Sequence, residues 1–215
     1  MTDTSISKTE RRKIEEVLVA QSASDGDGVR LKRVFGGGNL ARFDPFLMLD
    51  EFGSNDPGDY IGGFPSHPHR GFETVTYMLE GHMEHRDHMG NVGQLMAGDA
   101  QWMKAGSGVI HSEMPKQVEG RMRGFQLWVS LPASEKMTPA SYTELAAASI
   151  PQYEIDGIHV KAIAGGLTLN GVAVSGPIAG LATEPDYLDI AVGPAQALLV
   201  DVPEGHTALV YVYEG

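Results

Sequence analysis

Short apolar runs, separated by turn residues, follow one another along most of the chain. Residues 72–80, FETVTYMLE, show the alternating side-chain pattern of a strand and are rich in β-branched and aromatic residues. The run ends at Gly81. Similar runs lie within 93–108, 109–115 and 124–132, each bounded by Gly, Pro, Asp or Ser. Short strands at near-regular spacing are typical of sandwiches and barrels. We therefore predict an all-β fold.

The N-terminal region predicts a tail followed by a hairpin. Residues 1–13 are polar and read as a disordered tail. The runs IEEVLVAQ (14–21) and VRLKRVF (29–35) flank the turn sequence SDGDG. Because an Asp-Gly step between two apolar runs is a hairpin signal, we expect both runs to be strands.

One segment predicts a helix. In TPASYTELAAAS (138–149), Thr138 is a candidate N-cap, Pro139 fits the first helical position, and alanines fill the interior. The Ile150-Pro151 step would end it. We expect residues 138–151 to be a helical linker between a first β unit at 14–137 and a second at 152–215.

The second unit carries a sign of internal duplication. ALVYVYEG (208–215) resembles TVTYMLEG (74–81), 134 positions earlier. At this shift the second copy stops where half a barrel remains to be built. We therefore expect an incomplete second barrel with an exposed or intermolecularly paired edge, and self-association through the C-terminal half.

Composition excludes several kinds of chemistry. The chain has no cysteine, so disulfides, thiolate zinc sites, iron–sulfur clusters and cysteine nucleophiles are all ruled out. The net charge of −12 disfavours direct binding to nucleic acid or to an anionic membrane. No window holds 18 consecutive apolar residues and the first residues contain no apolar leader, which favours a cytoplasmic address.

Histidines supply the candidate chemistry. His67 and His69 are two residues apart, as are His111 and Glu113. Residues i and i+2 of a strand point to the same face, so two neighbouring strands could present three imidazoles and one carboxylate to one ion. Such a mixed nitrogen and oxygen set suits a divalent first-row metal with positions left open for other ligands.

Two further features compete with this assignment. Glu73 shares the face of His67 and His69 if the strand is continuous, so it could replace Glu113 as the carboxylate. The cluster GHMEHRDH (81–88) is dense in charge, and we interpret it mostly as a solvated face in which His85 and Asp87 fix a turn. At the 134-residue shift His67 corresponds to Asp201 and His69 to Pro203, so we expect no metal site in the second copy.

Four ordered blocks resemble the pirin family of the cupin superfamily. They are DPFLMLDEF, GGFPSHPHRGFETVTYMLEG, GDAQWMKAGSGVIHSEMP and GFQLWVSLP, and the resemblance runs from about Val17 to Pro151. It implies a bicupin of two jelly-roll (double-stranded β-helix) barrels, the N-terminal one binding a metal through His67, His69, His111 and Glu113. On this basis Glu113 is preferred to Glu73. Iron(II) is the metal implied first, with manganese, nickel, cobalt or copper as alternatives.

The resemblance implies two functions. The first is a quercetin 2,3-dioxygenase, in which O2 opens the heterocyclic ring of a flavonol with release of CO and Glu113 accepts the proton of the 3-hydroxyl. Trp102, Met103 and Phe72 are then candidate pocket walls. The alternative is a non-catalytic, iron-dependent regulatory protein that acts through protein partners.

Overall fold

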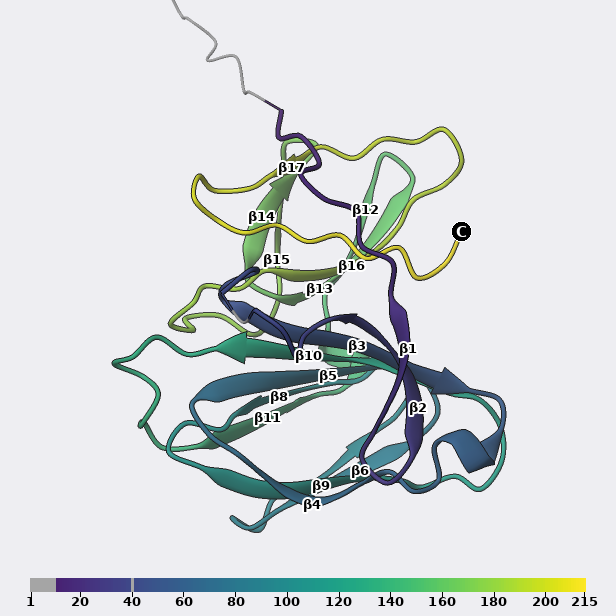
Figure 1. Cartoon of the computed structure of the whole chain (residues 1–215). Helices are drawn as coiled ribbons and strands as arrows, with labels where there is room; N and C mark the ends of the chain where they lie inside the picture. The colour runs from purple at the N-terminus through teal and green to yellow at the C-terminus, as the bar shows by residue number, and fades with distance from the viewer. Residues whose placement is uncertain (1–10, 40) are drawn as a thin grey trace, which may run out of the picture.

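Strands joined by tight turns make up nearly all the regular structure, in a computed structural model that describes residues 11–39 and 41–215. Figure 1 shows an N-terminal barrel, purple to teal, beneath a smaller C-terminal part in green and yellow. Among the described residues the helical turns are two short 3-10 helices, η1 (Pro57–Asp59) and η2 (Ala147–Ser149). The predicted all-β class is confirmed.

Two antiparallel sheets form the N-terminal barrel. The larger has the order β1-β2-β3-β10-β5-β8-β11 and the smaller the order β4-β9-β6-β7. Strands distant in sequence are neighbours in both, as in a jelly roll. The strands are β1 (Gln21–Asp25), β2 (Val29–Phe35), β3 (Phe46–Ser54), β4 (Phe64–His69), β5 (Phe72–Glu80), β6 (Met83–Asp87), β7 (Val92–Leu95), β8 (Ala100–Lys104), β9 (Val109–Pro115), β10 (Met122–Ser130) and β11 (Ser141–Leu145).

The interior strand β5 is buried on both faces. Val75 and Tyr77 pack in one apolar cluster with Ile163 and Ile178 of the C-terminal part. Met78, from the opposite face, packs with residues of β2, β3, β6, β7 and β10 inside the barrel. The second half therefore covers the outer face of the large sheet, and the barrel interior is left for the site.

The C-terminal part consists of two three-stranded sheets, ordered β12-β13-β16 and β15-β14-β17. Its core is apolar and includes Ile158, Val160 and Leu169. The strands are β12 (Gln152–Ile155), β13 (Ile158–Ala164), β14 (Gly166–Leu169), β15 (Val172–Ser175), β16 (Tyr187–Ala191) and β17 (Val200–Asp201).

The predicted helix at 138–149 is wrong. Residues 141–145 form β11, which pairs with β8 from Ser141 opposite Lys104 to Leu145 opposite Ala100, and only Ala147–Ser149 make a helical turn. The pairing satisfies the backbone of β11 and completes one edge of the large sheet, so tertiary contacts override a local helix preference. The large sheet thus extends past residue 137, and the division between the two units stays a prediction.

The N-terminal hairpin forms, but it starts later than predicted. β1 pairs with β2, and the turn between them places Gly26 and Gly28 at positive φ, which glycine adopts without strain. Residues 14–20 are not in a strand, and the side chains of Val17 and Val19 are exposed. Of the predicted tail, residues 1–10 lie outside the described part, and 11–13 have no regular structure.

The last residues lie against the barrel without strand pairing. The segment at 208–215 resembles residues 74–81 of β5 in sequence, yet residues 202–215 have no strand assignment. Tyr211 and Tyr213 pack against Phe125 of β10, and the ion pair between Arg123 and Glu214 adds a polar contact. No helix in the described ranges has the length and apolar character needed to cross a membrane.

Candidate metal centre

Neighbouring strands bring His67, His69 and His111 together. In the antiparallel pair of β4 and β9, His67 lies directly opposite His111, and His69 follows on the same face of β4. The Nε2 atoms of His67 and His69 are 3.0 Å apart. One ring nitrogen from each of the three lies within 4.8 Å of the others. The two strands therefore gather three imidazoles at one point.

Local backbone chemistry orients His67. Its Nδ1 lies 2.7 Å from the carbonyl oxygen of Pro65, which can only accept, so Nδ1 carries the hydrogen and Nε2 keeps its lone pair. Pro68 lacks an N–H group and is tolerated because β4 is an edge strand of the small sheet. A histidine held in this way is ready to ligate a metal through Nε2.

Burial keeps the other two imidazoles neutral. Burial and the neighbouring histidines lower the pKa of His69 and of His111 from 6.5 to about 3. The Nε2 of His111 is buried and has no hydrogen-bond partner among the described residues. A lone pair sequestered beside two other imidazoles matches what a divalent metal requires, so these residues fit such an ion.

Glu113 lies next to this group on β9. Its carboxylate forms a second close set with His111 and His85, again within 4.8 Å. The hydroxyl of Thr76 lies 2.8 Å from Glu113 Oε1, so β5 of the large sheet contacts the carboxylate. Gln126 of β10 lies 2.8 Å from the same hydroxyl and does not contact Glu113 directly. The four predicted ligands thus lie in one region, with Glu113 toward the His85 side.

Glu73, the competing carboxylate, lies on the other face of β5. It lines a cavity of about 300 Å³ between the large sheet and the C-terminal part, together with Trp102, Lys104 and Ile178. Its pKa is raised because it is buried. The strand pleat separates it from the histidines, since Thr74 and Thr76, its neighbours on the opposite face of β5, point inward.

Aromatic rings stand beside His69. The ring centroids of Phe72 and Trp128 lie 5.0 and 5.1 Å from that of His69, and 4.7 Å from one another. Of the three predicted walls, Phe72 is next to the site, Met103 packs inside the barrel, and Trp102 faces the C-terminal part. Strand parity could have found Trp128, because it shares its face of β10 with Gln126.

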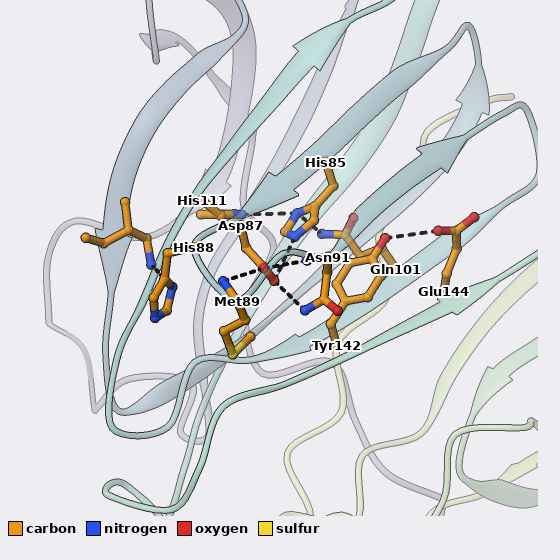
Figure 2. A network of polar contacts seen from close by, with 10 residues as sticks. His85, Asp87, His88, Met89, Asn91, Gln101, His111, Tyr142 and Glu144 are labelled. Atoms are coloured by element: carbon orange, nitrogen blue, oxygen red, sulfur yellow. Dashed lines mark hydrogen bonds and ion pairs between the residues drawn. The ribbon is translucent and has the colours of Figure 1, made fainter.

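His85 is the residue that sequence reasoning missed. It was assigned to a solvated face, but it is fully buried, its ring is stacked on Tyr142 at 4.5 Å, and its Nδ1 lies 3.4 Å from that of His111 (Figure 2). The strand β6 explains the error: Met83, His85 and Asp87 alternate toward the interior, while Arg86 points outward. The buried methionine at the start of that alternation was the available signal.

The remaining histidines belong to neither close group. His82 contacts Gln94 near the surface, and His88 is exposed beyond β6. His159 is exposed on β13 and His206 is partly exposed after β17. The solvated interpretation therefore holds for these four side chains.

Comparisons with known proteins agree with this architecture. A family model described as Pirin matches residues 28–129. A protein of Pseudomonas aeruginosa named "Putative quercetin 2,3-dioxygenase" is 52% identical over 208 residues, 96% of this chain and 73% of that protein. A pirin-like protein of Caulobacter vibrioides is 50% identical over 205 residues, 95% of this chain and 73% of that protein.

A solved structure adds the fold. The crystal structure of a quercetin 2,3-dioxygenase from Acinetobacter baumannii superposes with a TM-score of 0.62 at 38% identity, over 69% of this chain and 55% of that one. Most of this chain therefore shares its fold with a protein of known structure. The chain belongs to the pirin family and has its cupin fold.

Proposed function

We propose that the chain holds one divalent transition metal through His67, His69, His111 and Glu113, and acts as a flavonol 2,3-dioxygenase of the quercetin type. The observation that carries the proposal is the buried, unpartnered Nε2 of His111 beside two further imidazoles. The names of the similar Pseudomonas and Acinetobacter proteins support the choice of reaction. Iron(II) is the first metal to test.

The metal, when bound, supplies Lewis acidity at its open positions, where the oxygens of a flavonol and O2 can be brought together. The three histidines would hold it as neutral imidazoles, and the lowered pKa values of His69 and His111 ensure the neutral form of these two at physiological pH. The net reaction adds both oxygen atoms of O2 to the flavonol and releases one carbon as CO.

Glu113 would act as the base. Thr76 donates to Oε1 at 2.8 Å, and the carboxylate keeps further lone pairs with which it would ligate the metal and accept the proton of the substrate's 3-hydroxyl. Removing that proton makes the flavonol electron-rich, which its reaction with O2 requires. Thr76 comes from a buried strand in the middle of the large sheet, so the carboxylate is held by a rigid element.

Phe72 and Trp128 would position the substrate. Their rings lie side by side next to His69, and a planar aromatic molecule can stack against such a pair. This places an apolar contact beside the candidate ligands, as expected for a site that binds a flat, largely apolar substrate.

The test is turnover with defined metals. Metal-free protein is loaded separately with iron(II), manganese, nickel, cobalt or copper, and quercetin loss, oxygen uptake and CO release are recorded together. Equal consumption of quercetin and O2 by at least one metal form, absent from the metal-free protein, is the expected result. Tight binding of one metal without turnover in any form would overturn the enzymatic proposal and favour the regulatory alternative.

A further inference from the structure

A chain of polar contacts runs from Nδ1 of His111 through His85 to Asp87. Figure 2 shows its members, with His85 between His111 and Asp87, and with Gln101 and Tyr142 against the His85 ring. The side chains of His85 and Asp87 are both fully buried. Neither residue belongs to the four candidate ligands, and their burial needs an explanation.

Asp87 is held firmly in place. Its Oδ1 accepts hydrogen bonds from the backbone N–H groups of Met89 and Asn91 at 2.9 and 3.0 Å, and its Oδ2 accepts one from the side chain of Asn91 at 2.8 Å. The same Oδ2 lies 3.4 Å from Nε2 of His85. A carboxylate can only accept, so the hydrogen of His85 sits on Nε2.

The opposite nitrogen of His85 is therefore an acceptor. Gln101 directs its amide nitrogen at Nδ1 of His85 from 3.1 Å, which requires a lone pair there. Nδ1 of His111 lies 3.4 Å from the same atom. Two lone pairs would repel at this distance, so the hydrogen in the contact belongs to His111. Its Nε2 then carries the lone pair, on the side of His67 and His69.

The ring of His85 is also fixed in orientation. Tyr142 of β11 stacks on it with 4.5 Å between centroids and 22° between planes, and the Tyr142 hydroxyl donates to Glu144 at 3.2 Å. The imidazole is thus clamped between an acceptor, a donor and an aromatic face. Asp87 can select its tautomer because the ring is already held in place.

We propose that Asp87 and His85 are positioning residues that set the tautomer of His111, so that its Nε2 is the ligating atom. The inference rests on the metal centre proposed above. Partners of this kind typically change metal affinity by about 10- to 100-fold when removed.

Asp87→Asn tests the chain with a change of one atom. The backbone donors of Met89 and Asn91 keep the oxygen of the new amide on their side, so its NH2 group faces Nε2 of His85. His85 must then carry its hydrogen on Nδ1, and His111 is driven to the Nε2–H form, which cannot ligate through Nε2. Asp56→Asn, the same change at an exposed position beside η1, is the matched control.

Two readouts are taken. In metal-free protein, long-range proton–nitrogen NMR assigns the tautomer of His111, and competition with a chelator measures the affinity for zinc. We expect Nδ1–H in the wild type and in Asp56→Asn, Nε2–H in Asp87→Asn, and about 10- to 100-fold weaker zinc binding in Asp87→Asn alone. An unchanged tautomer with affinity within twofold of the wild type would overturn the inference.

A second pair of variants distinguishes a change of tautomer from a folding defect. His85→Asn keeps an acceptor near the place of Nδ1, whereas His85→Leu removes it. We expect zinc affinity to fall less in His85→Asn, and Asp87→Asn to cost nothing further in the His85→Asn background. Equal losses in both His85 variants, or additive losses in the double variant, would contradict the proposal.

The outcomes separate this inference from the metal centre itself. If the wild type binds no zinc, both the proposed metal centre and this inference are contradicted. If the wild type binds zinc and Asp87→Asn binds it equally tightly, only the inference is contradicted and the metal centre stands. Two zinc ions per chain, with the second lost in His85→Leu, would also overturn it, because His85 would then be a ligand together with His111 and Glu113.

Discussion

Strands β9 and β13 carry opposite patterns. In β9 the inward residues include His111 and Glu113, while Ile110 on the outer face is 50% exposed. In β13 the inward residues include Ile158 and Val160, while His159 is exposed. Buried and exposed residues alternate in the named parts of both strands. In β9, however, these buried side chains are polar groups that water would otherwise solvate, whereas in β13 they are apolar.

The difference concerns where candidate metal ligands lie in the two halves. Burying imidazoles and a carboxylate costs free energy unless a partner compensates, so the pattern of β9 points to a ligand, whereas the pattern of β13 points to an ordinary core. Both groups of histidines and carboxylates close enough to hold a metal, among the described residues, lie in the N-terminal barrel. The C-terminal half instead covers the outer face of the large sheet.

Removing a ligand should have the largest effect. His111→Ala deletes the imidazole that belongs to both close groups, and we expect metal affinity to fall by more than about 100-fold and turnover to vanish. Elemental analysis after dialysis and oxygen uptake measure these two effects. His159→Ala, on β13, should change neither metal affinity nor turnover. A loss of metal in that variant would contradict the assignment of metal binding to the N-terminal barrel alone.

Two carboxylates on opposite sides of β5, Glu113 of β9 and Glu73 of β5 itself, give the next prediction. Glu113→Gln should weaken metal binding by about 10- to 100-fold and abolish turnover, because the amide can neither neutralise the metal nor accept the substrate's proton. Glu73→Gln makes the same change on the outer face. It should leave metal affinity within about twofold, measured by the same chelator competition. Equal losses of metal affinity in the two variants would indicate that Glu73 also contributes to metal binding.

Acid should destabilise the metal-free barrel through its histidines. His69 and His111 have a pKa of about 3 when folded and 6.5 when exposed. The unfolded chain therefore binds more protons below pH 6.5, and the free energy of unfolding falls as pH drops toward 3, by at most about 1.4 kcal/mol per pH unit for each group. Urea unfolding between pH 7 and 5 measures this, above the range in which most carboxylates titrate.

His69→Gln is the control for the pH effect. Glutamine stays neutral throughout, so the variant should lose less stability between pH 7 and 5 than the wild type does. The same pH slope in both proteins would show that His69 does not contribute to the effect.

The smallest effect is expected between the halves. Tyr77 of β5 donates a hydrogen bond to Asp189 of β16 at 2.7 Å. Tyr77→Phe should lower the free energy of unfolding by about 1 kcal/mol and leave metal affinity unchanged. Urea unfolding and zinc competition check this pair of outcomes. A change in metal affinity would mean that the covering half acts on the site.

The sequence predicted strands well where one pattern dominates. Residues 72–80 and 109–115 alternate clearly and are strands in the structure. It failed at 138–149, because Pro139 and the alanines favour a helix locally, while pairing with β8 decides the outcome. The local sequence contains no signal that these residues can pair with an open edge of the large sheet.

Individual site residues followed the same rule. His67, His69 and His111 were found because two residues on one strand share a face, and the structure brings them together. His85 was missed because its neighbours, such as Arg86, are charged and suggest solvent. Trp102 was wrongly named as a pocket wall because only the sheet order shows which face of its strand lines the interior.

The two-sided burial of β5 limits how the chain can change in length. Inserting or deleting one residue before Thr76 would exchange the two faces of the strand, moving Tyr77 into the barrel and Thr76 into the contact with the second half. One event would then disturb both the support of Glu113 and the packing of Val75 and Tyr77 against the C-terminal part. Length variation should therefore be tolerated in the turns around β5, and essentially nowhere within it.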